Sequence, residues 1–516
     1  MMIRSESGLV RRAAALCVMV ATGVCAAQAD RFVREASEPP PNVRDDRRSD
    51  LVLLPALAQL DAPPGAVESL RRARMIAADD PSFAAAATWA QSAAAKGVLE
   101  ALATVTDERR PRRAFAFAQG YGVEAATPEL AEAGLYTDLG SQGLLALAEF
   151  GYRAEGLDRL TVLVHIEATR RAAAGEVAEA IELLTQYVVF ERQLVDRAFM
   201  VEQLTALRRI IEALERIRDV AYVDFEGDRK LAPSQIPDLV SALENEDGFL
   251  RTNRISFPFG DRLLAEQLVE RVYGDSESVD RARFGTVMAE LETYGRPLRL
   301  FGQAGAWASR SGSQATRTEV LNELDFVIGD YEAMWALEDP YHPQVLDGFY
   351  ADTADVNRHA AALSVLPNGR LLFAMKHRLR VEIAGTRSCL AVVGYAMANN
   401  GFPPTLAACR PRFIDVLEGD AMSPTRTAVR LPPLGYIAST TARRSEPPAG
   451  WPHAMSVAVG GESFLVEVPD SEFVLYSVGI DGQDNSATRV TGTPFGREGT
   501  DHVIWPPAMS LERSRE

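Results

Sequence analysis

Residues 367–404 of this chain, PNGRLLFAMKHRLRVEIAGTRSCLAVVGYAMANNGFPP, contain a long helical pattern with a clear beginning and end. Pro367-Asn368-Gly369 precedes the pattern, and Asn399-Asn400-Gly401 followed by two prolines is a typical helix stop. The apolar side chains in between recur at helical spacing, at Leu372, Met375, Leu379, Ile383, Leu390, Val393 and Met397. With a rise of about 1.5 Å per residue, the predicted helix is about 45 Å long.

After this helix the sequence changes to a β pattern. Apolar runs or alternations at residues 455–459, 462–468 and 473–478 are bounded by glycine or proline, which indicates strands. Gly460-Gly461 indicates a tight hairpin between the first two. We therefore expect residues 386–516 to form a small α+β tail, with the long helix packed on an antiparallel sheet. Residues 346–385 are expected to form a connecting segment and the start of that helix.

Residues 51–345 have a helical pattern almost throughout, and the segment 160–220 is its clearest part. The apolar stripe of one helix has alternating spacings of four and three residues, at Met200, Leu204, Leu207, Ile211 and Leu214. The carboxylates of Glu212 and Glu215 on the same helix are interpreted as its solvated face. The predicted fold class is therefore mainly α, with a helical domain at 51–345 ahead of the α+β tail.

The turn at residues 175–181 carries small and apolar residues at Gly175, Val177, Ala180 and Ile181. This turn resembles the middle of a tetratricopeptide repeat. Tyr187 and Arg192 stand where that family usually has a small residue and a proline, and no second copy follows at a fixed period. The resemblance implies an irregular, α-solenoid-like arrangement of the helical domain.

The N-terminus has the pattern of a secretory signal. Arg4, Arg11 and Arg12 form a positively charged region ahead of an apolar run at residues 13–21, and Ala27-Gln28-Ala29 is a typical cleavage site. We expect residues 1–29 to be removed on export, to the periplasm or the cell exterior, and residues 30–50 to be a flexible leader. An uncleaved anchor is the alternative, although the apolar run is short for a membrane span.

The charge of the chain argues against some classes of partner. The 516 residues carry a formal charge of −17; removing residues 1–29 takes away three arginines and one glutamate, which leaves 51 basic and 70 acidic residues and a charge of −19. Such a chain is poorly suited to bind nucleic acid or an anionic membrane unaided. No later segment approaches the length of a membrane span, so we expect no stable membrane insertion after cleavage.

Three segments of the tail carry a family resemblance: LAVVGYAMANNGFP at 390–403, FVLYSVGIDG at 473–482 and DHVIW at 501–505. They resemble the helix end, the final strand with its Asp-Gly loop, and the closing Asp and Trp of the major pseudopilin of type II secretion. True pseudopilins begin with an apolar membrane helix, whereas Lys376, His377, Arg378 and Arg380 would be costly in lipid here. The resemblance therefore implies a pseudopilin-like module within a soluble protein.

A second resemblance extends over the whole chain. Gly260-Asp261-Arg262-Leu263-Leu264 and Tyr273-Gly274-Asp275, ahead of such a tail, are similar to a group of uncharacterised secreted bacterial proteins.

The pseudopilin resemblance implies a calcium site in the loop after the last strand. The matching positions are Asp481 and Asp501, and Asp484 and Asn485 are further oxygen donors. The alternative is a solvated turn, because Asp-Gly and Asp-Asn are ordinary turn formers.

Cys389 and Cys409 are the only cysteines after residue 29. An exported compartment favours a disulfide between them, which would close a loop of about 20 residues and stabilise the fold by about 3 kcal/mol. Two buried free thiols are the alternative, and the sequence leaves both open.

The histidines form no recognisable metal-binding or catalytic motif, and the densest polar group joins His342 and His359 with Asp339, Asp352 and Asp355. Our first hypothesis is an exported, non-enzymatic scaffold protein with protein partners in the cell envelope. One alternative is a hydrolase-type periplasmic enzyme with a site near His342 and His359. The other is an accessory component of a secretion filament.

Overall fold

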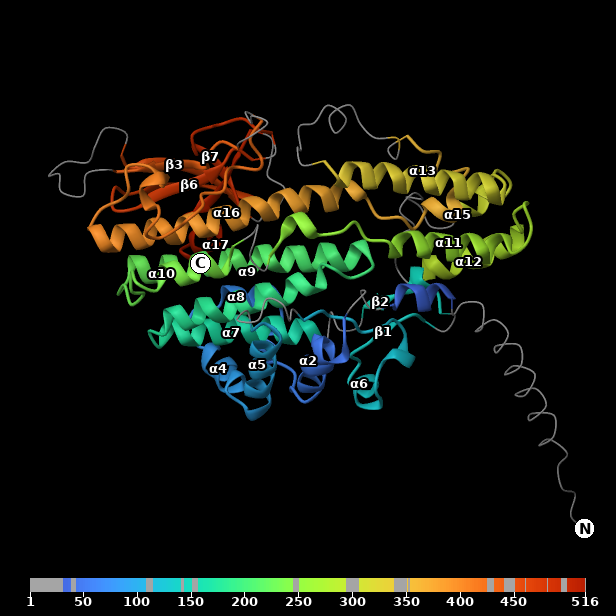
Figure 1. Cartoon of the computed structure of the whole chain (residues 1–516), viewed down its shortest axis with the longest axis horizontal. Coiled ribbons are helices and arrows are strands. Elements are labelled where there is room, and N and C mark those ends of the chain that lie inside the picture. The colour runs from blue at the N-terminus through green and yellow to red at the C-terminus, as the bar shows by residue number, and fades with distance from the viewer. Residues whose placement is uncertain are drawn as a thin grey trace, which may run out of the picture.

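The structure is a computed structural model of the whole chain. It describes residues 31–38, 43–107, 115–140, 143–150, 156–244, 250–293, 306–337, 350, 353–424, 431–439, 451–459, 461–479, 481–492 and 499–515. The segment 1–29, predicted to be a signal peptide, lies outside these residues. The described chain is mainly helical with a small six-stranded mixed sheet near its C-terminus (Figure 1), so the coarse fold class is as predicted.

The helices are stacked in layers (Figure 1). They include α2 (Ser49–Ala58), α3 (Leu70–Met75), α4 (Phe83–Ala90), α5 (Ala93–Val105), α6 (Pro128–Glu132), α7 (Asp158–Ala173), α8 (Val177–Leu194), α9 (Met200–Glu226), α10 (Ile236–Ala242), α11 (Gly260–Tyr273), α12 (Arg281–Thr293), α13 (Arg317–Trp335), α15 (Ala360–Leu363), α16 (Gly369–Asn399) and α17 (Ala508–Arg513). In Figure 1, α2 and α4–α6 form the lowest layer, α7–α10 cross the middle, and α16 lies above them. The sheet covers one end of α16, and α11–α13 and α15 lie at the other.

The helices predicted in segment 160–220 are confirmed as α7, α8 and α9. Gly175 turns the chain between α7 and α8 with φ at +81°, a backbone conformation that favours glycine. The predicted stripe on α9 is buried except at Leu204, which is partly buried. Glu215 is not on a solvated face, because it accepts a 3.2 Å hydrogen bond from the Met509 backbone of α17. That contact joins residues 294 apart, so no local pattern could show it.

The long helix α16 begins and ends where the sequence predicts. The Asn368 side chain caps its N-terminus by accepting a 3.1 Å hydrogen bond from the Arg370 N–H. Asn400 ends it in the left-handed conformation, with φ at +53°. Both signals are local, which is why the sequence was sufficient here.

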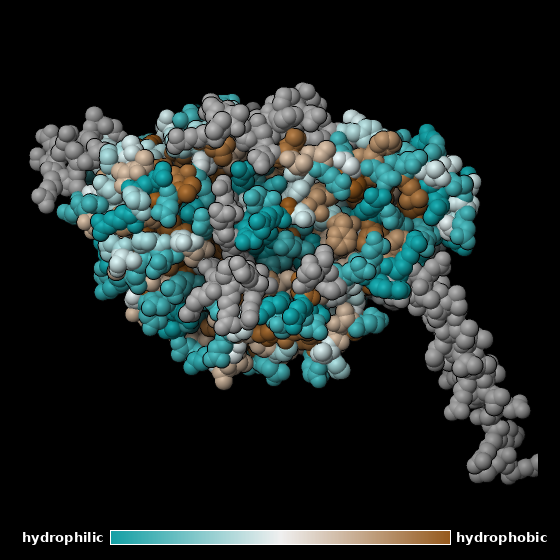
Figure 2. Space-filling model, in the orientation of Figure 1, coloured by the Kyte–Doolittle hydropathy of each residue, from teal (hydrophilic) through white to brown (hydrophobic). Residues whose placement is uncertain are grey.

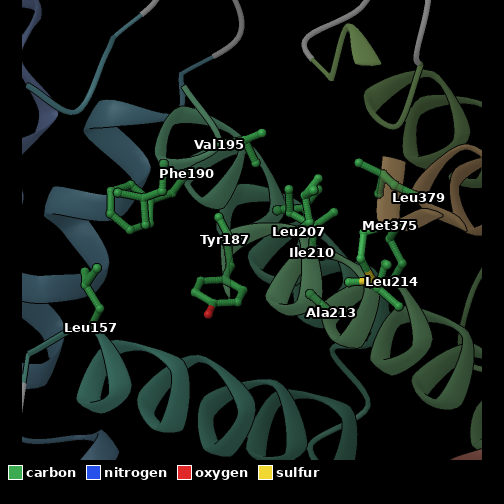
Figure 3. Packing of buried hydrophobic residues seen from close by; sticks show 14 of the residues in the cluster. Leu157, Tyr187, Phe190, Val195, Leu207, Ile210, Ala213, Leu214, Met375 and Leu379 are labelled. Carbon is green, nitrogen blue, oxygen red and sulfur yellow. The ribbon is translucent and has the colours of Figure 1, made fainter. Parts of the chain in front are cut away.

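Helix α16 packs along α9, and this contact forms the centre of the core. In Figure 3, Met375 and Leu379 of α16 lie beside Leu207 and Leu214 of α9. All four side chains are fully or almost fully buried. One buried hydrophobic cluster, the main cluster, includes residues from both ends of the described chain, from Phe32 to Trp505. One helix therefore serves both the region predicted as the helical domain and the region predicted as the tail.

The sheet contains β3 (Gly435–Ala438), β4 (His453–Val459), β5 (Glu462–Val468), β6 (Phe473–Ser477), β7 (Arg489–Thr491) and β8 (Asp501–Trp505), in the spatial order β3-β6-β8-β7-β4-β5. The predicted β4–β5 hairpin is confirmed, with Gly461 at φ +89°. The prediction of an antiparallel sheet is wrong, because β7 pairs in parallel with both β4 and β8. A three-residue strand such as β7 is too short to show alternation in the sequence.

The described part of the segment 30–50 is not the flexible leader that the sequence predicts. Residues 31–36 are helical, and Phe32 and Ala36 are buried in the main cluster. At its other end, buried Asp50 accepts a 2.9 Å hydrogen bond from the Ala118 N–H and pairs with Arg48 at 2.6 Å. A few apolar side chains among prolines and charges are enough to anchor this segment.

Candidate functional site

The residues predicted to bind calcium lie in one loop region beside β8. Both carboxylate oxygens of buried Asp501 accept from the Asn485 N–H, at 3.1 and 3.2 Å, and one also accepts from Ala487 at 2.7 Å. Asp481 accepts from the backbone of Gln483 at 3.1 Å and of Gly499 at 2.6 Å. These hydrogen bonds fasten the loop to the start of β8.

Asp484 and Asn485 take part in the same bracing. One oxygen of Asp484 accepts from the Tyr476 hydroxyl at 3.0 Å and from the Ser486 N–H at 2.7 Å, and the Asn485 amide donates to the Gln483 carbonyl at 3.2 Å. Burial raises the pKa of Asp501 to about 6. Within the ranges that the structure describes, no three His, Cys, Asp or Glu side chains are grouped so that they could hold a metal ion. Calcium binding therefore stays a prediction from the resemblance.

Cys389 and Cys409 are free thiols in the structure, and both are buried. Burial raises the pKa of the Cys409 thiol to about 12 and raises that of Cys389 further. Of the two alternatives open at the sequence level, the structure has the free thiols and not the disulfide. A thiol with so high a pKa is a poor nucleophile at neutral pH.

Of the polar group around His342 and His359, the structure describes only part. His342, Asp339 and Asp352 lie outside the described residues. The Nδ1 atom of His359 is 3.1 Å from the Asp355 carbonyl and 3.7 Å from Glu323 Oε1 of α13. The Tyr350 hydroxyl donates its one proton to the Glu323 carboxylate and lies 2.8 Å from both carboxylate oxygens. The predicted group therefore stays a prediction, and the described residues add a His359–Glu323–Tyr350 cluster beside α13.

A buried ionic cluster that sequence reasoning missed joins α9, α16 and β8. Glu382 lies at its centre: Arg378 Nε is 2.5 Å from its Oε1, His502 Nε2 is 2.9 Å from the same oxygen, and Arg218 Nη2 is 2.7 Å from Oε2. Burial opposes ionisation, but the two arginines and His502 outweigh it and hold the pKa of Glu382 well below its usual value. All four side chains are buried, so this cluster fixes the packing of the core.

A pocket of about 350 Å³ lies at the C-terminal ends of α7 and α9, and Arg513 of the C-terminal helix α17 also lines it. Its polar wall is formed by Arg216 and Asp219 of α9 and Arg513 of α17. Arg513 donates two 3.0 Å hydrogen bonds to Asp219, and Arg216 pairs with the same carboxylate. Burial raises the pKa of Asp219, but the two guanidinium groups outweigh it and the net shift is downward. No sequence signal could reveal this wall, because its members come from distant parts of the chain.

The motif Gly260-Asp261, noted in the second resemblance, has a structural role. Asp261 is buried at the start of α11 and accepts a 2.7 Å hydrogen bond from the N–H of Met200, the first residue of α9. A side chain at position 260 would lie 2.7 Å from the Ala198 carbonyl, so only glycine allows this approach. The motif therefore docks α11 on the N-terminus of α9.

Comparisons of the chain with protein-family models, curated proteins and solved structures find no significant match. Among the helices that the structure describes, none is both long and apolar enough to cross a membrane. On the face in Figure 2, hydrophobic residues lie in several separate groups among hydrophilic ones.

Proposed function

We propose that this chain is an exported, non-enzymatic interaction protein that binds a protein partner in the cell envelope. The observation that carries the proposal is an exposed aromatic pair formed by Phe326 of α13 and Tyr350. Phe326 is 64% exposed and Tyr350 is 47% exposed, and their ring centroids are 6.1 Å apart in an edge-to-face arrangement. Aromatic side chains are enriched in protein interfaces and often dominate their binding energy.

The pair is held in position before any partner arrives. The carboxylate of buried Glu323 accepts the Tyr350 hydroxyl proton, with both oxygens 2.8 Å away, and so fixes this ring beside Phe326. A fixed aromatic side chain loses little conformational entropy on binding. Helix α13 also lies on the outside of the molecule, at the end away from the sheet (Figure 1).

The proposal includes the finer description of the fold. An irregular, α-solenoid-like domain is supported by the helix–turn–helix of α7 and α8 around Gly175. A pseudopilin-like tail is supported by the long helix α16 lying against β6 and β8 of a small sheet. Stacked helices of this kind offer extended surfaces to protein partners.

The test is a cross-linked affinity purification from the cell envelope, read by mass spectrometry, with the wild type and two variants. Phe326→Ser should abolish recovery of the partner, because it removes the exposed ring. Leu465→Ser on β5 is the matched control, since Leu465 is 69% exposed and lies far from α13 in the fold. Equal recovery with both variants, or equal loss, would contradict the proposal. Filament subunits among the recovered proteins would identify the partner as a secretion filament.

A hydrolase is the second candidate, and the His359–Glu323–Tyr350 cluster favours it. A carboxylate beside an imidazole is a common arrangement for general acid–base work. If the chain is such an enzyme, His359→Ala should abolish turnover in a hydrolase substrate screen and leave partner recovery unchanged. Retained turnover in that variant excludes this cluster as the site.

A further inference from the structure

The pocket between α7, α9 and α17 has unused hydrogen-bond donors on its polar wall. A guanidinium group has five N–H donors. Arg216 uses one on Asp219 and one on the Thr169 hydroxyl, at 2.6 Å. Arg513 uses two on Asp219 and one on the Met75 carbonyl, at 3.1 Å. Arg216 is almost fully buried, and its Nε has no hydrogen-bond partner.

The Asp219 carboxylate at this wall already accepts several hydrogen bonds, whereas the guanidinium groups keep unused donors. Asp219 accepts from Arg216, twice from Arg513, and from the Ser510 hydroxyl at 2.5 Å. Two guanidinium groups thus share a single, saturated carboxylate. Because burial and the nearby cations Arg513 and Arg74 lower the pKa of Arg216, the wall favours a further negative charge.

The acidic residues elsewhere around the pocket are already engaged. Asp224 accepts from the backbone of Lys230 at 2.7 Å and of Leu231 at 3.0 Å, and Asp228 lies 3.4 Å from the Lys230 ammonium group. The printed contacts of both carboxylates are with residues 228–231. At the wall itself two guanidinium groups share the one carboxylate of Asp219, so positive charge is in local excess at Arg216 and Arg513.

The pocket is also lined by small apolar side chains, two of which stand on α9 next to the guanidinium wall. Val177 of α8 and Val220 and Val223 of α9 line it together with alanines of α7. Val223 is 55% exposed and stands at the pocket rim. A pocket of about 350 Å³ with this lining has space for a small apolar group.

We infer that this pocket binds a carboxylate carried on a small, branched apolar body. Planar guanidinium groups match a carboxylate in two parallel hydrogen bonds, and the valines and alanines of the lining accept the aliphatic part. Two sources present this chemistry: the C-terminal valine of a peptide and a free short-chain organic acid. This inference is independent of the proposed function, because neither Phe326 nor Tyr350 lines this pocket.

The test is isothermal titration calorimetry on the purified protein that begins at residue 30. The probes are acetyl-alanyl-valine with a free carboxylate, the same peptide as its C-terminal amide, and isovalerate. The amide should bind at least about tenfold more weakly than the acid, which is the loss expected for one charge-assisted hydrogen bond. Binding of the peptide acid alone assigns a peptide terminus, and binding of isovalerate alone assigns a free organic acid.

Two matched variants place the binding in this pocket. Val223→Glu puts a negative charge on the rim without removing a buried contact, so it should weaken binding of the carboxylate by about tenfold. Val416→Glu is the control, because Val416 is the same residue type with a similar exposure of 50% and does not line the pocket; its affinity should match the wild type. Equal affinity for acid and amide, unchanged binding in Val223→Glu, or no binding of any probe in the millimolar range would overturn the inference.

Discussion

Arg513 and Asp219 are joined by two hydrogen bonds of 3.0 Å, although 294 residues separate them in the sequence. Asp219 is fully buried on α9, and Arg513 belongs to the last helix, α17. The contact holds the C-terminal helix α17 against α9, the long helix of the helical region. It is a direct reason why the helical region and the tail share one core.

Removing this contact should destabilise the fold. We expect Arg513→Ala to lower the free energy of unfolding by about 1.5–3 kcal/mol, because Asp219 loses charge-assisted hydrogen bonds and stays buried. The measurement is urea unfolding followed by circular dichroism. Arg515→Ala is the control: Arg515 pairs with Glu462 at 3.2 Å, but both side chains are exposed, so its effect should stay within about 0.5 kcal/mol. Equal losses of unfolding free energy in the two variants would show that the contact with Asp219 stabilises the fold no more than an exposed ion pair does.

The contact between α16 and β8 leads to a second prediction, at Gly385. A methyl group at this position would lie 2.7 Å from Cγ2 and 2.8 Å from Cδ1 of Ile504. Gly385→Ala should therefore destabilise the protein by about 1–3 kcal/mol through overpacking, although alanine is the better helix former. Its effect can be read as a lower melting temperature.

Gly329 of α13 is the matched control for Gly385. It is also within a helix, but a methyl group there meets no other atom within 4 Å. Gly329→Ala should stabilise the protein by about 0.5–1 kcal/mol, because only the helix propensity changes. If both variants stabilised the protein, the result would contradict the close contact between Gly385 of α16 and Ile504 of β8.

These contacts separate what the sequence could predict from what it could not. The bounds of α16 and the β4–β5 hairpin depend on local signals at Asn368, Asn400 and Gly461, and the sequence predicted both. The parallel pairing of β7 and the contact of Glu215 with α17 depend on residues far away in the chain. The same holds for the guanidinium wall of the pocket. Periodicity identifies elements, whereas sites made between distant elements require the fold.

The resemblance to pseudopilins yields a prediction about calcium. Calcium should raise the melting temperature of the full-length protein, and a chelator should reverse this, because a ligand of the folded state stabilises by about 2.7 kcal/mol at a hundredfold excess over its Kd. Asp481→Asn should remove the calcium response and keep a carbonyl oxygen as acceptor for the Gln483 N–H. Asp470→Asn, at an exposed position between β5 and β6, should keep the response. A melting temperature that is the same with calcium and with chelator would refute the site.

The contact between Asp261 and Met200 predicts how stability depends on pH. Burial raises the pKa of Asp261 to about 7, so the folded state binds its proton more tightly than the unfolded chain does. Protonated Asp261 therefore favours folding at low pH, and this contribution is lost as pH rises to about 7, at about 1.4 kcal/mol for each unit of pKa difference. Asp261→Asn keeps an acceptor for the Met200 N–H but cannot ionise, so its stability relative to the wild type should rise between pH 5 and pH 8. Asp325→Asn, at an exposed position of α13, should show no such rise. Denaturant unfolding at both pH values measures the difference, and parallel pH profiles of wild type and Asp261→Asn would exclude a raised pKa at this contact.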